Sequence, residues 1–198
     1  MPVSTIKQLK YSTISEHKSL ESLYPFNRLL SVDLTRRDYF CVLKILYALH
    51  ELLDQNISQL PEIQRLQAGV RNTKENLNID LSNQKPDEVG TNLAVQPVVD
   101  IEFRCDSTLI GALYVAEGAK LGARIILRAL ENRPDKDHLP LQYYKVAAKD
   151  SSWKSFGDTI ECLTLENKIE ADTCVAGAKA TFDALIHCAE KMSKHSVT

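Results

Sequence analysis

Apolar residues recur at steps of three and four along nearly the whole of this chain. In the first such segment, around residues 5–23, one stripe is formed by Ile6, Leu9, Thr13, His17, Leu20 and Tyr24. This spacing follows one face of an α-helix, which turns about every 3.6 residues. No segment shows the apolar–polar alternation between hairpin turns that predicts β-strands. The sequence therefore predicts an all-α protein.

Capping signals mark where the next helices begin. Thr35 followed by Asp38 resembles a capping box, in which each side chain bonds the backbone N–H of the other, and it predicts a helix running to about Asp54. Ser58 stands just before "QLPEIQRL" and is predicted to cap a third helix.

The second half of the chain carries three more helical segments. Asp106 or Ser107 is predicted to cap a helix that reaches about Asn132. The stretch "NRPDKDHLP" that follows is typical of a turn. Two further helices are predicted over about 150–163 and 167–193.

One segment between the two halves breaks the helical period. Residues 82–105 hold two prolines and a glycine, which predicts a long loop. Residues 194–198 are predicted to be a frayed tail. With 198 residues and no internal repeat, residues 1–198 are expected to form a single domain.

Charge and cysteine content exclude several classes of protein. A formal net charge of −2 gives no basis for binding nucleic acid. The five cysteines are odd in number and lack CxxC spacing, so we expect neither a disulfide framework nor a zinc or iron–sulfur site, but small buried side chains in a reducing compartment. The amino terminus is too polar for a signal peptide, and no stretch reaches membrane-spanning length. We expect a cytoplasmic protein without a membrane partner.

Two glycines stand one turn apart inside the segment "YVAEGAKLGARIILRAL". A glycine within a helix costs roughly 0.5–1 kcal/mol relative to alanine. Gly118 and Gly122, together with Ala119 and Ala123, leave one side of this helix almost bare. Two explanations fit: another helix packs closely there, or a flat ligand lies directly against the backbone.

The histidine of the first helix allows two interpretations. His17 lies within the apolar stripe, where it is either a core histidine bonded to a carbonyl or a ligand to a metal or haem iron. Lys10 stands seven residues earlier, about 10.5 Å along a helix axis, a separation that suits a cation reaching a haem propionate. The competing histidines are His50, in the middle of a helix, and then His138, His187 and His195.

Five segments, taken together, resemble the haem oxygenases, and most closely the bacterial branch that degrades haem for iron. In chain order they are "ISEHKSLES", "LTRRDYFCVLKILYALHELLD", "GALYVAEGAKLGARII", "SWKSF" and "GAKATFDAL". They cover nearly the whole length. The resemblance implies a single-domain helical bundle, with haem between the first helix and a distal helix kinked at its glycines.

The resemblance also implies roles for individual residues. His17 would be the iron ligand, and Gly118, Gly122 and Ala119 would cover the other face of the ring. Ala119 departs from the family, which has serine or aspartate there. The remaining haem-binding residues implied are Lys10, Glu21, Tyr114, Lys154, Phe182 and, on a less certain alignment, Arg71.

The implied activity is that of an enzyme for which haem b is both substrate and cofactor. Oxygen and electrons from a ferredoxin or flavin reductase, or from ascorbate in vitro, would give biliverdin, carbon monoxide and ferrous iron. Lys10 and Tyr114 match members that open the ring at the α position, so we expect biliverdin IXα. Iron acquisition by a monomer is the expected setting.

Two other functions stay open at this stage. One is a haem carrier or store on the same fold, for which Ala119 would be the telling departure. The other is a related all-α fold that handles a different small molecule, with His17 in the core. Lys120, Arg124 and Arg128 recur at four-residue steps away from the glycines, which predicts a solvated face or a docking surface for an acidic electron donor.

Overall fold

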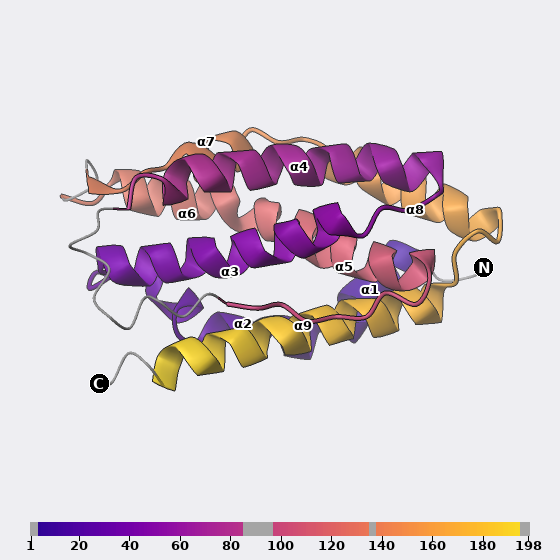
Figure 1. The fold of residues 1–198 in the computed structure, drawn as a ribbon, viewed down its shortest axis with the longest axis horizontal. Helices are drawn as coiled ribbons and strands as arrows, with labels where there is room; N and C mark the ends of the chain where they lie inside the picture. Colours follow the sequence, from indigo (N-terminus) through magenta and orange to yellow (C-terminus); the bar gives the residue numbers. More distant parts are fainter. Residues whose placement is uncertain (1–3, 85–96, 135–137, 195–198) are drawn as a thin grey trace.

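A computed structural model of the protein describes residues 4–84, 97–134 and 138–194. Within these ranges the regular structure is entirely helical (Figure 1), so the predicted all-α class is confirmed. The helices are α1 (Thr5–Ser12), α2 (Ile14–Ser22), η1 (Phe26–Arg28), α3 (Arg36–Gln55), α4 (Pro61–Leu81), α5 (Asp106–Ala119), η4 (Lys120–Gly122), α6 (Ala123–Glu131), α7 (Gln142–Ala147), α8 (Trp153–Leu165) and α9 (Ala171–Lys194). None of them combines the length and apolar character that a membrane span requires.

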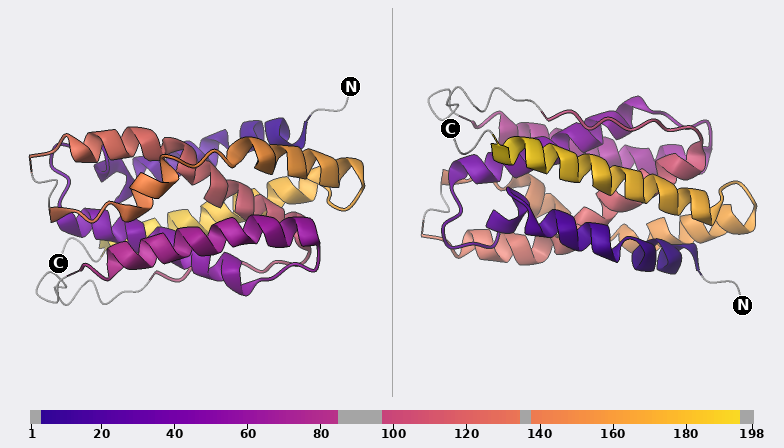
Figure 2. Two further views of the ribbon diagram at one scale, coloured as in Figure 1. Left: turned by 90° about the horizontal axis from the view of Figure 1, so that it is seen from above. Right: turned by 90° about the horizontal axis from the view of Figure 1, so that it is seen from below.

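The long helices lie along one axis of the molecule (Figure 1). α5 and α9 form the most extensive helix pair, α3 packs along α4, and α1 and α2 lie on the outer side of α9. Figure 2 shows α1 and α2 running beside α9 in the view from below. The core divides into a cluster around α5 and α9 and a second cluster, rich in tyrosine, where α3 meets α6 and α7.

The tight contact between α5 and α9 depends on two glycines. A Cβ added to Gly111 would stand 2.1 Å from the carbonyl oxygen of Cys174, and one added to Gly177 would stand 2.3 Å from that of Thr108. Real Cβ atoms do not approach backbone so closely. Close helix packing through glycine therefore occurs in this protein, but at Gly111 and Gly177.

The first predicted helix is broken in two. α1 ends at Ser12 and α2 begins at Ile14, because Thr13 leaves helical geometry with φ −117° and ψ 8°. The Thr13 hydroxyl donates to the carbonyl of Leu9 at 2.8 Å, a local bond that competes with the helical pattern. The start of α1 is held by the Glu161 carboxylate of α8, which accepts from the amides of Thr5 and Ile6.

The capping predictions are right for one helix and wrong for two. Thr35 and Asp38 form the expected capping box of α3, which ends one residue beyond Asp54. Leu60, not Ser58, precedes the first residue of α4; the Ser58 hydroxyl accepts from the Leu60 amide instead.

The glycine-bearing helix also starts and continues differently from the prediction. Cys105, rather than Asp106 or Ser107, occupies the position before α5. The helix does not run on to Asn132: a 3₁₀ turn at η4 separates α5 from α6.

The end of the chain contains one helix that the periodicity did not predict. α7 lies between the predicted turn "NRPDKDHLP" and the helix predicted from about residue 150, and its first two amides donate to the buried carboxylate of Asp80 on α4, at 2.9 and 2.8 Å. α8 and α9 start later than predicted, separated by a turn in which Asn167 adopts φ 54°. The three buried cysteines are Cys41, Cys174 and Cys188, whereas Cys105 and Cys162 are exposed, contrary to the expectation.

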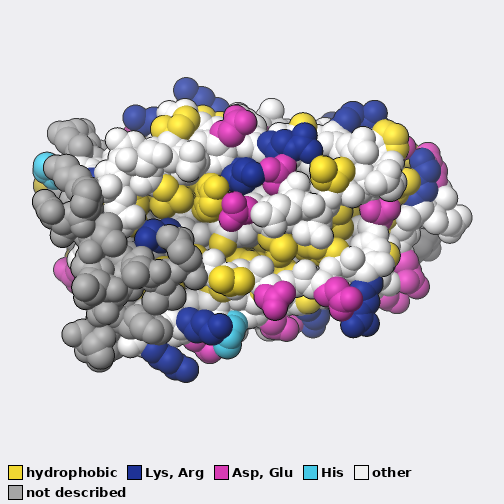
Figure 3. All heavy atoms as spheres, viewed as in Figure 1, with side chains coloured by type: hydrophobic (Ala, Val, Ile, Leu, Met, Phe, Trp, Pro, Cys, Tyr) yellow, Lys and Arg dark blue, Asp and Glu magenta, His cyan; other side chains and the backbone are white. Residues whose placement is uncertain are grey.

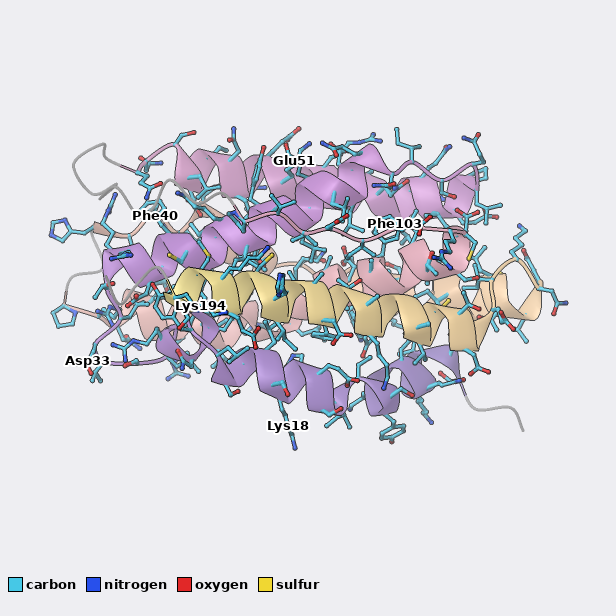
Figure 4. All side chains as sticks on the ribbon, turned by 60° about the horizontal axis from the view of Figure 1, so that its bottom comes forward. Lys18, Asp33, Phe40, Glu51, Phe103 and Lys194 are labelled. Atoms are coloured by element: carbon cyan, nitrogen blue, oxygen red, sulfur yellow. The ribbon has the colours of Figure 1, made fainter. Side chains whose placement is uncertain are left out.

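Part of the predicted loop 82–105 crosses the molecule as an extended segment. Val99 is buried, and Ile101 and Phe103 pack against the core around α9 (Figure 4). The Cys188 thiol donates to the carbonyl of Val98 at 3.2 Å. On the same side of the molecule, hydrophobic side chains form a band between charged edges (Figure 3). Residues 85–96, and 195–198 of the predicted tail, lie outside the described residues.

Candidate functional site

The two glycines at the break of the α5–α6 helix face open space. A Cβ on Gly118 would have the Trp153 ring at 4.0 Å as its near neighbour, and one on Gly122 would have only Ile126 of the next turn, at 3.8 Å. Alanine would fit at both positions as far as the described protein atoms are concerned. Close helix packing, the first explanation for the pair, is therefore wrong, and no other described helix covers the backbone at these two glycines.

Aromatic side chains border this bare stretch on one side. The Tyr114 and Trp153 rings lie 5.7 Å apart, and Trp153 stacks on Phe156 at the same separation. Burial raises the pKa of the Tyr114 phenol, and a hydrogen bond with the Thr13 side chain partly offsets this. Tyr114 thus links the glycine-bearing helix to the break between α1 and α2.

His17 lies on α2 with its ring largely accessible. Its side chain is 54% exposed, so the prediction of a position inside the apolar stripe is wrong, and with it the interpretation as a core histidine. The neighbouring Lys18 points out to solvent (Figure 4), and His17, turned about 100° from it, reaches α9. There the imidazole meets the Phe182 ring edge to face, with centroids 5.8 Å apart.

An acidic side chain lies beside the Nδ1 atom of His17. Glu21, one turn later on α2, has its Oε2 atom 3.4 Å from His17 Nδ1. A carboxylate at Nδ1 favours the tautomer whose Nε2 carries the free lone pair. The structure therefore brings His17, Glu21 and Phe182 together, as three of the residues predicted from the sequence.

The Thr13–Tyr114 contact relates His17 to Gly118. His17 lies one helical turn beyond Thr13, and Gly118 lies one turn beyond Tyr114. α2 and α5 run in the same direction along the molecule (Figure 2). The accessible imidazole of His17 and the bare backbone at Gly118 therefore each lie one turn beyond the Thr13–Tyr114 contact, on α2 and α5 respectively.

His50, the main competing histidine, is a core residue. It is 1% exposed, and its Nδ1 atom lies 2.8 Å from the carbonyl oxygen of Leu46. Burial lowers its pKa to about 4, with a smaller contribution from the Lys120 charge. His138 and His187 are exposed, and His195 lies outside the described residues.

Three predicted cationic residues have different surroundings. Lys10, in the last turn of α1, and Lys154, on α8, are both exposed. Arg71 forms an ion pair with Asp54 of α3, its Nε 2.6 Å from the carboxylate. Gly69 is the α4 position that faces Glu117 of α5, and Arg71 lies about 200° further round the helix. The structure thus places Arg71 on a different side of α4 from Gly69, in an ion pair with Asp54, and its haem-binding role stays a prediction.

A buried charge cluster lies beneath the break in the helix, where a solvated face was expected. Lys120 is only 8% exposed; its Nζ lies 2.6 Å from Glu117 Oε2 and 2.7 Å from Asp150 Oδ2. Burial acts to raise the pKa of Asp150, but bonds from Lys120 and Ser152 outweigh it and the pKa is lowered. The i,i+3 spacing of Glu117 and Lys120 was the one sequence signal for this cluster.

Arg124 and Arg128 do remain on the surface. Both are exposed on α6, and so are the nearby apolar side chains of Leu121 on η4 and Ile125 on α6. A shallow groove of about 380 Å³ runs beside them, lined in part by Trp153 and Ala148. The surface combines positive charge with exposed apolar area.

Comparison with known proteins gives three matches. The sequence profile of the family described as heme oxygenase matches residues 4–191. A heme oxygenase of Xanthomonas campestris pv. campestris (strain 8004) is 37% identical over 73 residues, which cover 36% of this chain and 44% of that protein. The match thus spans less than half the length of this relative.

The third match is to a solved structure, that of the NO- and CO-bound heme oxygenase from Neisseria meningitidis. It has a TM-score of 0.61 and 20% sequence identity, covering 96% of this chain and 92% of that chain. At this identity the likeness shows a shared fold. The family profile extends from the start of α1 almost to the end of α9, and by that match the chain belongs to the heme oxygenase family.

Proposed function

We propose that the chain is a haem oxygenase that holds haem b between α2 and the glycines at the α5–η4 junction. The observation that carries the proposal is the open space over Gly118 and Gly122, on a helix joined to the start of α2 by the Tyr114–Thr13 hydrogen bond. A flat substrate can approach the backbone there, because the nearest described atoms to an added Cβ are the side chains of Trp153 at 4.0 Å and Ile126 at 3.8 Å.

His17 is the proposed iron ligand. Its ring is accessible, and the Glu21 carboxylate 3.4 Å from Nδ1 favours ligation through Nε2, with the Phe182 ring packed against the imidazole. Lys10 and Tyr114, with Lys154 as a further cation, are proposed to bind the propionates.

The opposite face of the substrate meets glycine and alanine. When bound, haem supplies the iron that activates oxygen, and the ring is opened to biliverdin, carbon monoxide and ferrous iron. Gly118, Gly122 and Ala119 contribute no acidic side chain there and leave room for oxygen and water. Ring seating by Lys10 and Tyr114 favours the α isomer, and the proposed role is iron acquisition.

Electrons must come from an external donor, a ferredoxin or flavin reductase. Arg124 and Arg128 on α6, with exposed Leu121 and Ile125 beside them, form a surface that suits an acidic donor. The enzyme is proposed to act as a cytoplasmic monomer, and ascorbate replaces the donor in vitro.

A hemin titration tests the proposal. Wild type should develop a ferric Soret band, and under air with ascorbate this band should decay as biliverdin and ferrous iron appear. His17→Ala should lose the iron-ligated spectrum, whereas His187→Ala, an exposed histidine on α9, should retain it. A band that persists with ascorbate indicates a haem carrier instead, and no binding by wild type rejects both functions.

The identity of the pigment tests the seating of the ring. Chromatography should give mainly biliverdin IXα. A mixture dominated by β and δ isomers would contradict the proposed roles of Lys10 and Tyr114.

A further inference from the structure

The chain's only tryptophan stands beside the glycine face, and an ion cluster lies next to it in the sequence. Trp153 is the first residue of α8, directly after Ser152. Its ring is the near neighbour of Gly118, at 4.0 Å from a Cβ built there, and also contacts Tyr114. Trp153 lies in the segment "SWKSF" that resembles the family, but the resemblance gave this residue no role of its own.

The ion cluster fastens the segment before α8 to the broken helix. The Lys120 ammonium lies between Glu117 of α5 and Asp150. The Ser152 hydroxyl donates to Glu117 Oε2 at 3.0 Å, and its amide donates to Asp150 Oδ1 at 2.6 Å. Two separate chain segments are thus tied together within three residues of Trp153.

These bonds are strong constraints because two of the three charged groups, those of Lys120 and Glu117, are buried. The side chains of Lys120 and Glu117 are 7% and 8% exposed, and that of Asp150 is 27% exposed. A buried charge without its partner is strongly unfavourable, so each member keeps the others in place. Water and salt screen such contacts far less than they screen exposed ion pairs.

We propose that Glu117, Lys120 and Asp150 are positioning residues that hold Trp153 against the backbone at Gly118. In this position the indole limits how far a bound haem ring can shift sideways. The part that concerns the ring rests on the proposed function; the part that concerns the placement of Trp153 does not. Loss of the ion cluster frees the indole, which widens the proposed haem site and allows the haem ring more than one orientation.

Fluorescence of the haem-free protein tests the placement, since Trp153 is the single emitter of its kind. Lys120→Met removes the charge at similar length, and should shift the emission to the red and raise the acrylamide quenching constant roughly twofold as the indole becomes accessible. Lys7→Met, at an exposed lysine on α1 that has no part in the proposed haem or donor sites, is the matched control and should leave both unchanged. Far-UV circular dichroism checks that each variant is folded.

Two milder variants keep the test decisive if Lys120→Met does not fold. Asp150→Asn retains shape and weakens one ion pair, so it should give a smaller shift in the same direction. Lys120→Arg retains the positive charge and should keep the emission of the wild type. An unchanged quenching constant in folded Lys120→Met or Asp150→Asn overturns the proposal.

The product of the haem-loaded enzyme tests the second part. With ascorbate as reductant, Lys120→Met and Trp153→Ala should both lose isomer selectivity, while Lys7→Met keeps the wild-type ratio. If the fluorescence of the variants changes but the isomer ratio does not, the proposed role of Trp153 in limiting the position of the haem ring is overturned. If wild type binds no haem, the proposed function fails while the fluorescence result still decides the placement.

Discussion

Gly111 of α5 and Gly177 of α9 meet at a crossing where neither position has room for a Cβ. Added Cβ atoms would fall 2.1 and 2.3 Å from carbonyl oxygens of the opposite helix. Gly118, two turns further along α5, has no such neighbour, since its nearest contact would be 4.0 Å away. Glycines on one helix therefore serve two different purposes.

Alanine at the crossing should destabilise the fold. Gly111→Ala and Gly177→Ala each force the two backbones apart, and we expect a loss of about 2–3 kcal/mol in the free energy of unfolding, despite alanine's better helix propensity. Urea titration measures this. Gly157→Ala is the control, because its Cβ would meet only Ile6 at an ordinary 3.6 Å. Equal stability of the Gly111 and Gly157 variants would contradict the packing argument.

Alanine at Gly118 or Gly122 should leave the fold stable but impair the proposed haem site. Gly118→Ala and Gly122→Ala should leave the free energy of unfolding unchanged or raise it by up to about 1 kcal/mol, through helix propensity. The added methyl groups should nevertheless weaken hemin binding or slow turnover, because they occupy the proposed ligand space. Melting curves and hemin titrations on the same samples separate the effects. Unaltered hemin affinity and turnover would show that the space is not used.

The buried imidazole of His50 should make stability depend on pH. Burial holds its pKa at about 4 in the folded protein, against 6.5 ordinarily. Between these values the unfolded chain binds a proton that the folded protein does not, so stability is full above about pH 6.5 and falls as the pH drops toward 4. The slope for this group approaches about 1.4 kcal/mol per pH unit.

His50→Gln should remove this dependence, since an amide can still donate to the Leu46 carbonyl but does not titrate. The free energies of unfolding of variant and wild type are measured from pH 7 to 4. In the difference between them, the contributions of the other titrating groups cancel. The wild type should lose more stability than the variant as the pH falls. Parallel curves would mean that His50 titrates normally.

Asp80 should be needed to hold α7 in place. Its buried carboxylate accepts from the first two amides of α7, although burial raises its pKa and so opposes the charged form. Asp80→Ala should cost about 1–2 kcal/mol, the usual range for a lost helix cap, and Asp80→Asn should cost less because one acceptor oxygen remains. Asn78→Ala, exposed on the same helix, is the control in urea unfolding at pH 7. A loss no larger than the control's would rule out the capping role.

The periodicity of the sequence predicted the helices but not their breaks. Leu9, Thr13 and His17 follow the helical spacing, so nothing in the pattern marks Thr13 as an interruption. The break accompanies a contact with Tyr114, a residue about a hundred positions away, that no local rule detects. α7 was missed for the same reason, because its start depends on Asp80 of another helix.

Charged residues were the hardest part of the site to predict. Lys120 shares a four-residue spacing with Arg124 and Arg128, which suggested one solvated face. The 3₁₀ turn at η4 changes the helical phase between Lys120 and Arg124, and Asp150 provides a partner thirty residues away. His17, Glu21 and Phe182 could be found from motifs, because two of them lie one turn apart and the third belongs to a recognisable segment.

The interruption at Thr13 separates two functions that an unbroken helix would couple. Lys10 belongs to α1, whose start is anchored to Glu161 of α8, whereas His17 belongs to α2, which rests on α9 with Glu16 bound to Lys179 at 2.9 Å. A substitution near Glu161 is therefore expected to move Lys10 more than His17. Under the roles proposed for these two residues, the break would let evolution adjust the orientation of the ring with less effect on the iron ligand.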